Sequence, residues 1–221
     1  ASGTLIAENR TTIDDFGYPL DMALSPDGIK MAVSYMRVNG NKISTHIAFY
    51  NFGSAGQMEL NNQVGELNVD DVLAPQIFFC DNSTAVAVRT DGFTVFSGSQ
   101  SPKEKKTVKF DQEIISTFHD GNRIGFVFDG GDYGHKYLMK VYNTGGKNTM
   151  QKYFDLQYNS ITLQKDKIVL FNEKEFAIYK LNGQKTFQGK YRKPIQNVLS
   201  IRGFRKYMVI TEDSADLIRL G

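Results

Sequence analysis

The residues of this chain best suited to chemistry gather in the glycine-rich segment Phe128 to Tyr137, which reads FDGGDYGHKY. Carboxylate oxygens two or three residues apart on a flexible loop are ligands that calcium accepts. Asp129 and Asp132 are therefore the candidate metal ligands, with His135 close behind them. The alternative interpretation is a solvated connection between two strands, in which the glycines adopt positive φ.

Other catalytic arrangements are not indicated by the sequence. His46, His119 and His135 are far apart and lack the spacing of metal ligands. Hydrolysis of glycosides needs two carboxylates about 5–10 Å apart, and the strands expected to be innermost carry few acids beyond Asp21 and Glu113. A Gly-x-Ser-x-Gly motif and a phosphate-binding loop are both missing. We therefore predict no catalytic residue and no cofactor.

The single cysteine, Cys80, excludes an internal disulfide. Its neighbours Phe78 and Phe79 indicate a small buried thiol rather than a reactive one.

Three aromatic residues lie in segments that we expect to be exposed loops. They are Phe16, Tyr18 and Tyr133. Aromatic anchors are enriched at recognition hot spots, so these three are the predicted ligand-binding residues.

The elements that must position these residues recur along the chain. Five short apolar segments alternate with polar turns: Met22–Ser25, Ile77–Cys80, Ser116–His119, Ile161–Gln164 and Leu199–Arg202. Their third residues are separated by 55, 39, 45 and 38 positions. Each segment is followed by a turn, a second apolar run and a third strand that usually contains an aromatic residue. A more polar fourth strand follows in the second, third and fourth units. This order is typical of the blades of a β-propeller.

We therefore predict an all-β fold, a β-propeller with about five four-stranded blades in a single domain over residues 1–221. The blade units are approximately 18–73, 74–111, 112–156, 157–195 and 196–221, with residues 3–11 as a closing strand of the last unit. The segment Gln57 to Leu73 has weak helical spacing, but its asparagine pair and Gly65 favour an outer strand with a long connection.

The first blade contains the turn LSPDG, Leu24 to Gly28. Pro26 presets the backbone of a tight turn, and Gly28 tolerates positive φ at its exit. Apolar residues alternate on both sides of this turn, at Met22, Leu24, Met31 and Val33. The pattern predicts a β-hairpin with one face buried.

The two ends of the chain leave two architectures open. The terminal LIRLG resembles the end of a third strand, and the initial ASGTLIAEN resembles a fourth strand. The first strand of a closed five-blade ring would then complete the last blade and remove exposed edges. In the alternative, the chain is the C-terminal part of a seven- or eight-bladed propeller.

Composition restricts the partners. The 26 Lys and Arg residues nearly balance 24 Asp and Glu residues, which argues against a nucleic-acid partner. The basic run Ser101 to Lys109 lies on an expected outer strand, where lysine commonly protects an edge. No apolar run has the roughly 18 residues of a membrane helix, and no leader peptide is evident.

The segment LSPDGIKMAVSY, from Leu24 to Tyr35, resembles the WD40-like repeats of TolB-type propellers. Tryptophan is absent, so the Trp-Asp ending of true WD40 repeats is missing. The longer run from Gly3 to Tyr35 is similar to an uncharacterised family of bacterial propeller proteins, mostly from Gram-positive gut residents, that carry one N-terminal membrane anchor. The resemblance implies an extracytoplasmic location, with membrane attachment only through a segment absent from this chain; a cytoplasmic location is the alternative. No activity is assigned to that family, so it supplies no catalytic residues.

We expect a non-enzymatic binding, scaffold or sensor propeller whose blade loops present a broad face to a protein, a peptide or a glycan. The alternative is a metal-dependent propeller hydrolase or lactonase. A third interpretation is a domain that only provides structure within a longer chain.

Overall fold

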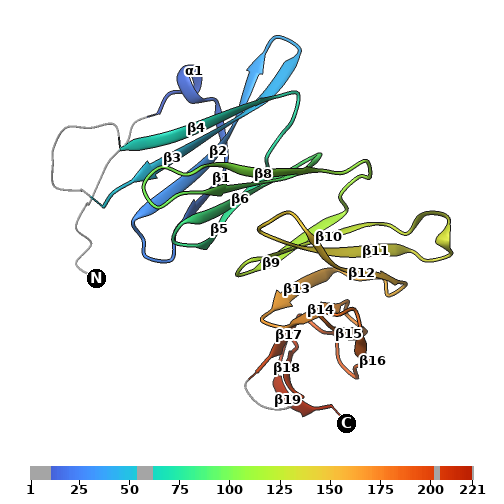
Figure 1. Cartoon of the computed structure of the whole chain (residues 1–221). Helices are drawn as coiled ribbons and strands as arrows, with labels where there is room; N and C mark the ends of the chain where they lie inside the picture. Colours follow the sequence, from blue (N-terminus) through green and yellow to red (C-terminus); the bar gives the residue numbers. More distant parts are fainter. Residues whose placement is uncertain (1–10, 54–61, 202–204, 221) are drawn as a thin grey trace. The chain divides into compact units, whose positions relative to one another are not determined.

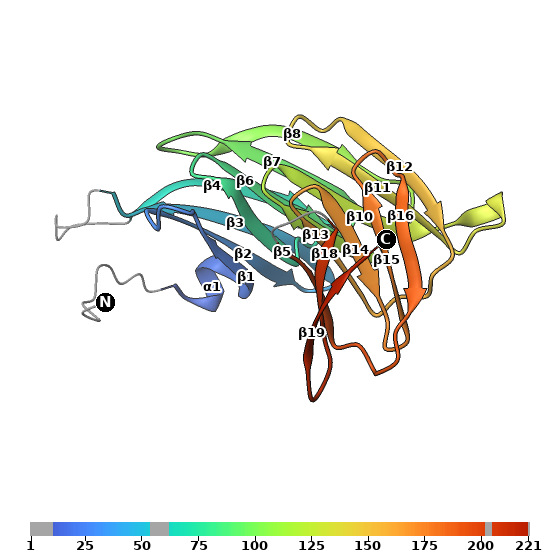
Figure 2. The ribbon, with the colours of Figure 1, turned by 90° about the horizontal axis from the view of Figure 1, so that it is seen from below.

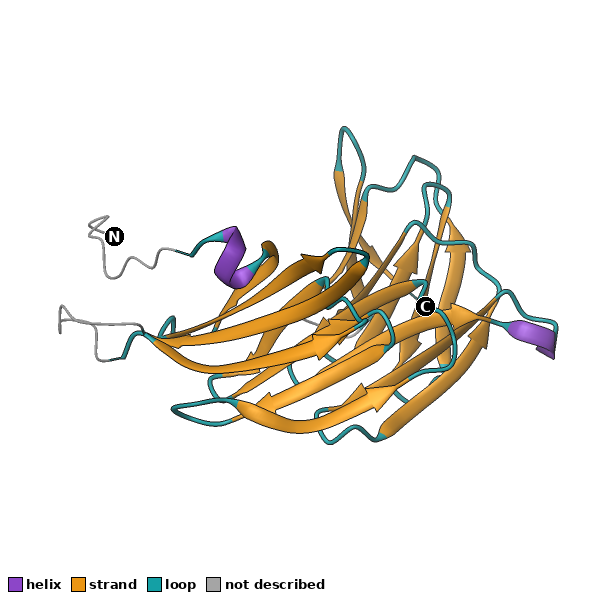
Figure 3. Ribbon diagram, turned by 90° about the horizontal axis from the view of Figure 1, so that it is seen from above, coloured by secondary structure: helices purple, strands orange, loops and turns teal. Residues whose placement is uncertain are grey.

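The computed structural model describes residues 11–53, 62–201 and 205–220. These residues form five antiparallel sheets, four with four strands and one with three (Figure 1). Strands dominate this described part, and its helical segments are one short turn of α-helix and one of 3₁₀-helix (Figure 3). The predicted all-β propeller class is confirmed.

The chain divides into two compact units. The first comprises residues 1–113 with 144–146, and the second residues 114–143 with 147–221. Each sheet lies within one of the five predicted blade units. The single-domain organisation stays a prediction, and the closing strand at residues 3–11 lies, apart from Thr11, outside the described residues.

The first unit contains two sheets, preceded by the short helix α1 (Ile13–Phe16), which is labelled in Figure 2. The Thr12 side chain caps this helix by accepting a hydrogen bond from the Asp15 N–H. The strands of the first sheet are β1 (Tyr18–Leu24), β2 (Lys30–Asn39), β3 (Lys42–Asn51) and β4 (Gln63–Asp70). Those of the second are β5 (Gln76–Asp81), β6 (Thr84–Arg89), β7 (Gly92–Ser97) and β8 (Lys103–Lys109). The outer strand expected within residues 57–73 is confirmed as β4, and residues 57–61 lie outside the described part.

The second unit contains the other three sheets, in chain order the third, fourth and fifth. The third sheet has β9 (Ser116–Asp120), β10 (Arg123–Asp129), β11 (Tyr137–Asn143) and β12 (Asn148–Phe154), with the 3₁₀ turn η1 (Gly131–Tyr133) between β10 and β11. The fourth has β13 (Ser160–Gln164), β14 (Lys167–Phe171), β15 (Glu175–Lys180) and β16 (Lys185–Lys190). The fifth has β17 (Asn197–Ser200), β18 (Lys206–Ile210) and β19 (Ala215–Arg219). Within each sheet, successive strands are neighbours, as in a propeller blade.

Each unit buries the faces of adjacent sheets against one another. In the first unit, Phe49 of β3 meets Phe96 of β7 with ring centroids 4.9 Å apart, and Ala32 and Ala87 are fully buried in the same cluster. In the second, one cluster joins the third and fourth sheets and another joins the fourth and fifth. In the first unit, alanines on β2 and β6 allow close approach of the two sheets, and phenylalanines on β3 and β7 fill the space between them.

The LSPDG turn joins β1 to β2 as predicted. The Gly28 N–H donates to the Ser25 carbonyl at 2.8 Å, and Gly28 has a φ of +72°. The Ser25 hydroxyl donates to the Asp27 carboxylate at 2.5 Å, which tightens the turn. Proline and glycine therefore act here as the turn chemistry requires.

The predicted buried face of β1 is wrong. Met22 and Leu24 are 61% and 58% exposed, whereas Ala23, between them, packs against the core shared with the second sheet. Asp21 lies on that same inner side, where its carboxylate accepts a hydrogen bond from the Ile77 N–H at 2.8 Å. The alternation of apolar side chains along β1 is correct. The face that the neighbouring sheet covers, however, is the one with the smaller side chains.

Candidate functional site

A hollow of the second unit lies between the outer strands β12 and β16 of its third and fourth sheets. It measures about 590 Å³. We call it the outer groove; its lining includes His135, Lys136, Lys152, Asp155, Glu175, Tyr179, Lys185 and Gln188. Strands β12, β15 and β16 of two adjacent sheets carry five of these residues, so the groove has rigid walls.

Register explains which side chains face the groove. Lys152 lies opposite Met139, and Lys185 lies opposite Tyr179. Met139 and Tyr179 both belong to the core between the third and fourth sheets. Directly opposed residues share a face of a sheet, so the two lysines approach the same space from opposite walls. Tyr153, the neighbour of Lys152, points to the other face of the third sheet.

His135 and Asp155 lie at one end of the outer groove. The His135 Nδ1–H donates to Asp155 Oδ2 at 2.9 Å, and the Lys136 N–H donates to Asp155 Oδ1 at 3.0 Å. Hydrogen bonding to His135, and then to the Lys136 backbone, holds the pKa of the Asp155 carboxyl below its usual range. Asp155 is thus a carboxylate whose two oxygens are both engaged in fixing the β10–β11 connection.

An aromatic row continues from His135 around the edge of β12. His135 stacks on Tyr153 with ring centroids 5.6 Å apart, and Tyr133 contacts Tyr153 at 5.2 Å. Tyr133 is 74% exposed. These three residues, here called the tyrosine row, offer a flat amphipathic surface beside the groove. Tyr133 was predicted from the sequence as a binding residue, and the structure places it here.

Phe16 and Tyr18, the other predicted binding residues, belong to the first unit. Phe16 is half-buried and packs against Tyr35 and His46 with ring centroids 5.5 and 5.4 Å apart. Tyr18 is 48% exposed and lines a separate hollow of about 660 Å³ beside Arg37 and Asp14. Phe16 is therefore part of a packed cluster that holds α1 on the first sheet, and Tyr18 remains available to a ligand.

The predicted metal ligands do not form a recognisable site. Asp129 accepts a hydrogen bond from the Gly131 N–H at 2.7 Å, which is a turn interaction. The side chain of Asp132 lies outside the described part. Within the described ranges, no group of three or more His, Cys, Asp or Glu residues could hold a metal ion.

Cys80 is half-buried. Burial, and then the nearby charge of Asp81, raises the pKa of its thiol to about 12. The thiolate that would act as a nucleophile or metal ligand is therefore disfavoured at neutral pH.

Sequence reasoning missed most of the outer groove. Lys152 and Tyr153 lie on β12, Asp155 follows that strand, and Lys185 lies on β16. They belong to no motif, because the two strands meet only when two sheets pack. The sequence feature that could have indicated this site is Tyr153, a large aromatic residue on a strand predicted to be polar and outermost.

The arrangement of the sheets defines the class of protein. Sheets of three or four antiparallel strands, each packed face to face with the next within its unit, make the protein a β-propeller. The chain belongs to a family of unknown function, DUF5711, which matches residues 1–220. No curated protein sequence matches the chain.

Solved structures agree on the fold. Sqt1 from Chaetomium thermophilum superposes with a TM-score of 0.61 at 11% identity, covering 87% of this chain and 55% of Sqt1. A second crystal structure of Sqt1 gives a TM-score of 0.60 at 10% identity, covering 92% and 62% of the respective chains. Hsv2 from Kluyvelomyces marxianus gives 0.51 at 13% identity, covering 91% and 62%. The chain thus spans little more than half the length of these proteins, and at such low identity the similarity establishes the fold alone.

No helix among the described residues is both long enough and apolar enough to cross a membrane.

Proposed function

We propose that the protein is a non-enzymatic binding propeller that holds a protein or peptide partner at the outer groove and the tyrosine row. The observation that carries this proposal is an exposed aromatic row beside a hollow of about 590 Å³ with strand-built walls. Large aromatic side chains on a rigid scaffold lose little conformational entropy on binding and dominate recognition surfaces. The size of the hollow suits one or two side chains or a short extended segment.

The alternative function, a metal-dependent propeller hydrolase or lactonase, has less support. Asp155 and His135 bond to each other, and the described part of the groove adds no nucleophilic serine or cysteine to them. A general base contributes to hydrolysis only when it reaches a nucleophile or a bound water.

We further propose that the propeller works on the extracytoplasmic face of the cell membrane, attached through a segment outside this chain. The family resemblance of the run from Gly3 to Tyr35 supports this location. Protease treatment of intact cells that express the tagged natural protein tests it. Digestion without lysis is expected, and protection until lysis would place the protein inside the cell.

The binding role is tested with the partner isolated on the immobilised chain. We expect Tyr133→Ala with Tyr153→Ala to weaken capture at least tenfold, because a pair of aromatic anchors typically contributes about 2 kcal/mol or more. Leu217→Ala is the control, since Leu217 is an exposed large side chain on β19, away from the groove and the tyrosine row. Equal capture by wild type and the double variant would reject the tyrosine row as part of the binding site.

A further inference from the structure

The outer strand of the fourth sheet presents an open edge. Among the described residues, β16 pairs only with β15, so its outer backbone N–H and C=O groups have no strand partner. A hollow of about 570 Å³ runs along this edge, lined by Glu175 and the residues of β16. Glu175, Lys185 and Gln188 line both this hollow and the outer groove. The two hollows therefore adjoin at these three residues.

Lysines line both of these adjoining hollows. Lys185 and Lys190 lie opposite Tyr179 and Glu175, which places both ammonium groups on the side of β16 that faces the third sheet. Lys152 faces the same space from β12. The Lys185 ammonium is oriented by a hydrogen bond of 2.7 Å to the side-chain oxygen of Gln188.

Few carboxylates neutralise these lysines. Both oxygens of Asp155 are already engaged by His135 and the Lys136 N–H. Glu175 is the remaining acid of the groove lining. The groove and the edge therefore carry an excess of positive charge in a chain whose total charge is only +2.

The open edge of β16 and the excess of lysine beside it indicate which kind of partner segment fits here. An exposed strand edge pairs with another extended polypeptide through main-chain hydrogen bonds. A second copy of the same edge would bring lysines against lysines, whereas a strand with carboxylates at alternate positions would place each of them near an ammonium group.

We propose that β16 pairs with an acidic, extended segment of a partner protein, whose alternate carboxylates reach Lys152, Lys185 and Lys190. The inference rests on the proposed function, because it names the chemistry of the partner held at the same groove. The pairing adds a fifth strand to the fourth sheet. An apolar side chain next to the acidic segment of the partner would contact the tyrosine row.

The test uses the whole chain and fluorescein-labelled peptides of alternating Glu and Thr, read by fluorescence anisotropy. We expect this peptide to bind, with affinity falling as salt rises, and the matched Lys–Thr peptide not to bind. Two further Glu–Thr peptides carry N-methyl groups on one or the other alternate set of residues. One of them should bind about tenfold more weakly, because it loses the main-chain donors that face β16.

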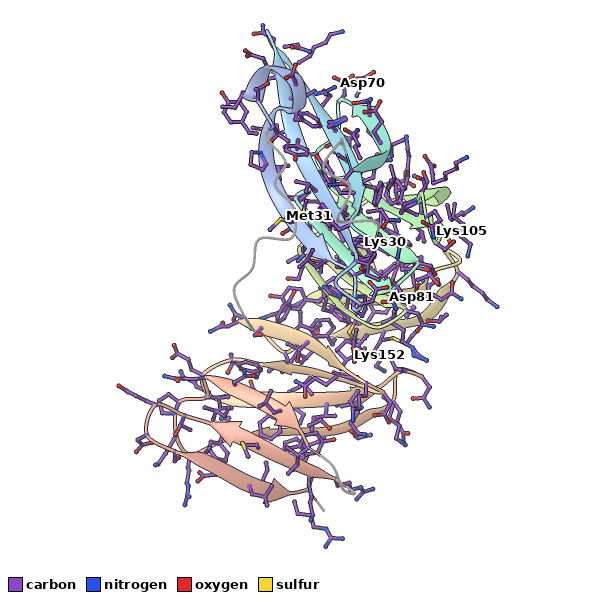
Figure 4. The ribbon with its side chains drawn as sticks, turned by 90° about the vertical axis from the view of Figure 1, so that its left-hand side faces the viewer. Lys30, Met31, Asp70, Asp81, Lys105 and Lys152 are labelled. Carbon is purple, nitrogen blue, oxygen red and sulfur yellow. The ribbon has the colours of Figure 1, made fainter. Side chains whose placement is uncertain are left out.

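Variants separate the groove from general charge. Lys152→Glu with Lys185→Glu should weaken binding of the Glu–Thr peptide about tenfold or more. Lys103→Glu with Lys105→Glu on β8, an equally basic outer strand of the first unit, is the matched control and should change little. Lys152 and Lys105 are labelled in Figure 4. Thermal melting of each variant verifies that the fold is retained.

Several results would overturn the inference: no binding of the Glu–Thr peptide, equal affinity of both N-methylated peptides, or equal losses in the two lysine pairs. Failure of the proposed function is distinguishable. A captured partner whose binding needs Tyr133 and Tyr153 but not Lys152 and Lys185 leaves the binding role intact and removes only the acidic strand.

Discussion

His46 shows how a single side chain can depend on its surroundings. It is 1% exposed on β3, between Phe16 of α1 and Tyr35 of β2. Its Nδ1–H donates to the side-chain oxygen of Asn68 at 2.8 Å. Among the described residues, its buried Nε2 meets no hydrogen-bond partner, and Glu66 Oε2 lies 3.9 Å away from it. We therefore treat His46 as a neutral imidazole whose Nε2 is shielded from water by the packing around it.

This burial predicts a stability that falls in mild acid. Desolvation, the largest effect, lowers the pKa of His46 below 6.5, and Asn68 only partly opposes it. The unfolded chain therefore binds a proton at higher pH than the folded chain does. His46 therefore does not change the free energy of unfolding above its pKa in the unfolded chain. Below that pKa, the free energy of unfolding decreases as the pH falls.

The measurement is urea unfolding of wild type and His46→Gln between pH 7.5 and pH 5, a range that brackets the unfolded pKa of about 6.5. We expect the wild type to lose more stability than the variant across this range, because glutamine does not titrate. Parallel pH profiles would contradict a buried neutral imidazole.

At the scale of the element, one glycine fixes the packing of the third sheet. Gly125 of β10 lies opposite Phe118 of β9, and a Cβ added at Gly125 would be 2.0 Å from an edge carbon of the Phe118 ring. Phe118 is 4% exposed and belongs to the core between the third and fourth sheets. The ring occupies the space that any other residue at position 125 would need.

Gly125→Ala is therefore expected to destabilise the second unit by about 1–3 kcal/mol, the range for overpacked cores. Gly28→Ala provides the comparison. Gly28 has a φ of +72°, but a Cβ there meets nothing within 4 Å, so only backbone strain of about 1 kcal/mol is expected. Denaturant midpoints decide the order, and an equal or larger loss at Gly28 would show that Phe118 can move aside.

The two faces of the first sheet differ in how they are covered, and the sequence of β1 alone does not determine which face is buried. The face of β1 that carries Met22 and Leu24 continues into Met31, Val33 and Tyr35 on β2, around a largely apolar hollow of about 320 Å³. Met31 and its buried neighbour Lys30 are labelled in Figure 4. The opposite face of the same sheet packs against the second sheet.

At the scale of the whole molecule, the binding and hydrolase hypotheses differ in their dependence on metal. We expect neither calcium nor a chelator to shift the melting temperature of the chain. The reason is that Asp129 is engaged in its own turn and the described residues hold no cluster of three ligands. A site of the usual extracellular affinity would reveal itself at calcium concentrations of about 0.1–1 mM. A clear rise in melting temperature, with calcium retained in the purified protein, would favour the metal-dependent alternative.

The sequence by itself determined the repeat, the strand order and the turns. The Ser25–Gly28 turn, the alternation along β1 and the polar outer strands β8, β12 and β16 could be predicted because turn geometry and strand period depend on residues close in the chain. Tyr133 was predicted as an exposed aromatic residue for the same local reason.

Only the tertiary structure decided which faces are covered and which side chains meet. Ala23 rather than Met22 faces the core of the first unit because the second sheet lies on that side. Lys152 and Lys185 share a groove because the third and fourth sheets pack together, and His135 reaches Asp155 across a hairpin. A strand's period specifies that its two faces differ, but contact with another sheet is what determines which face loses its water.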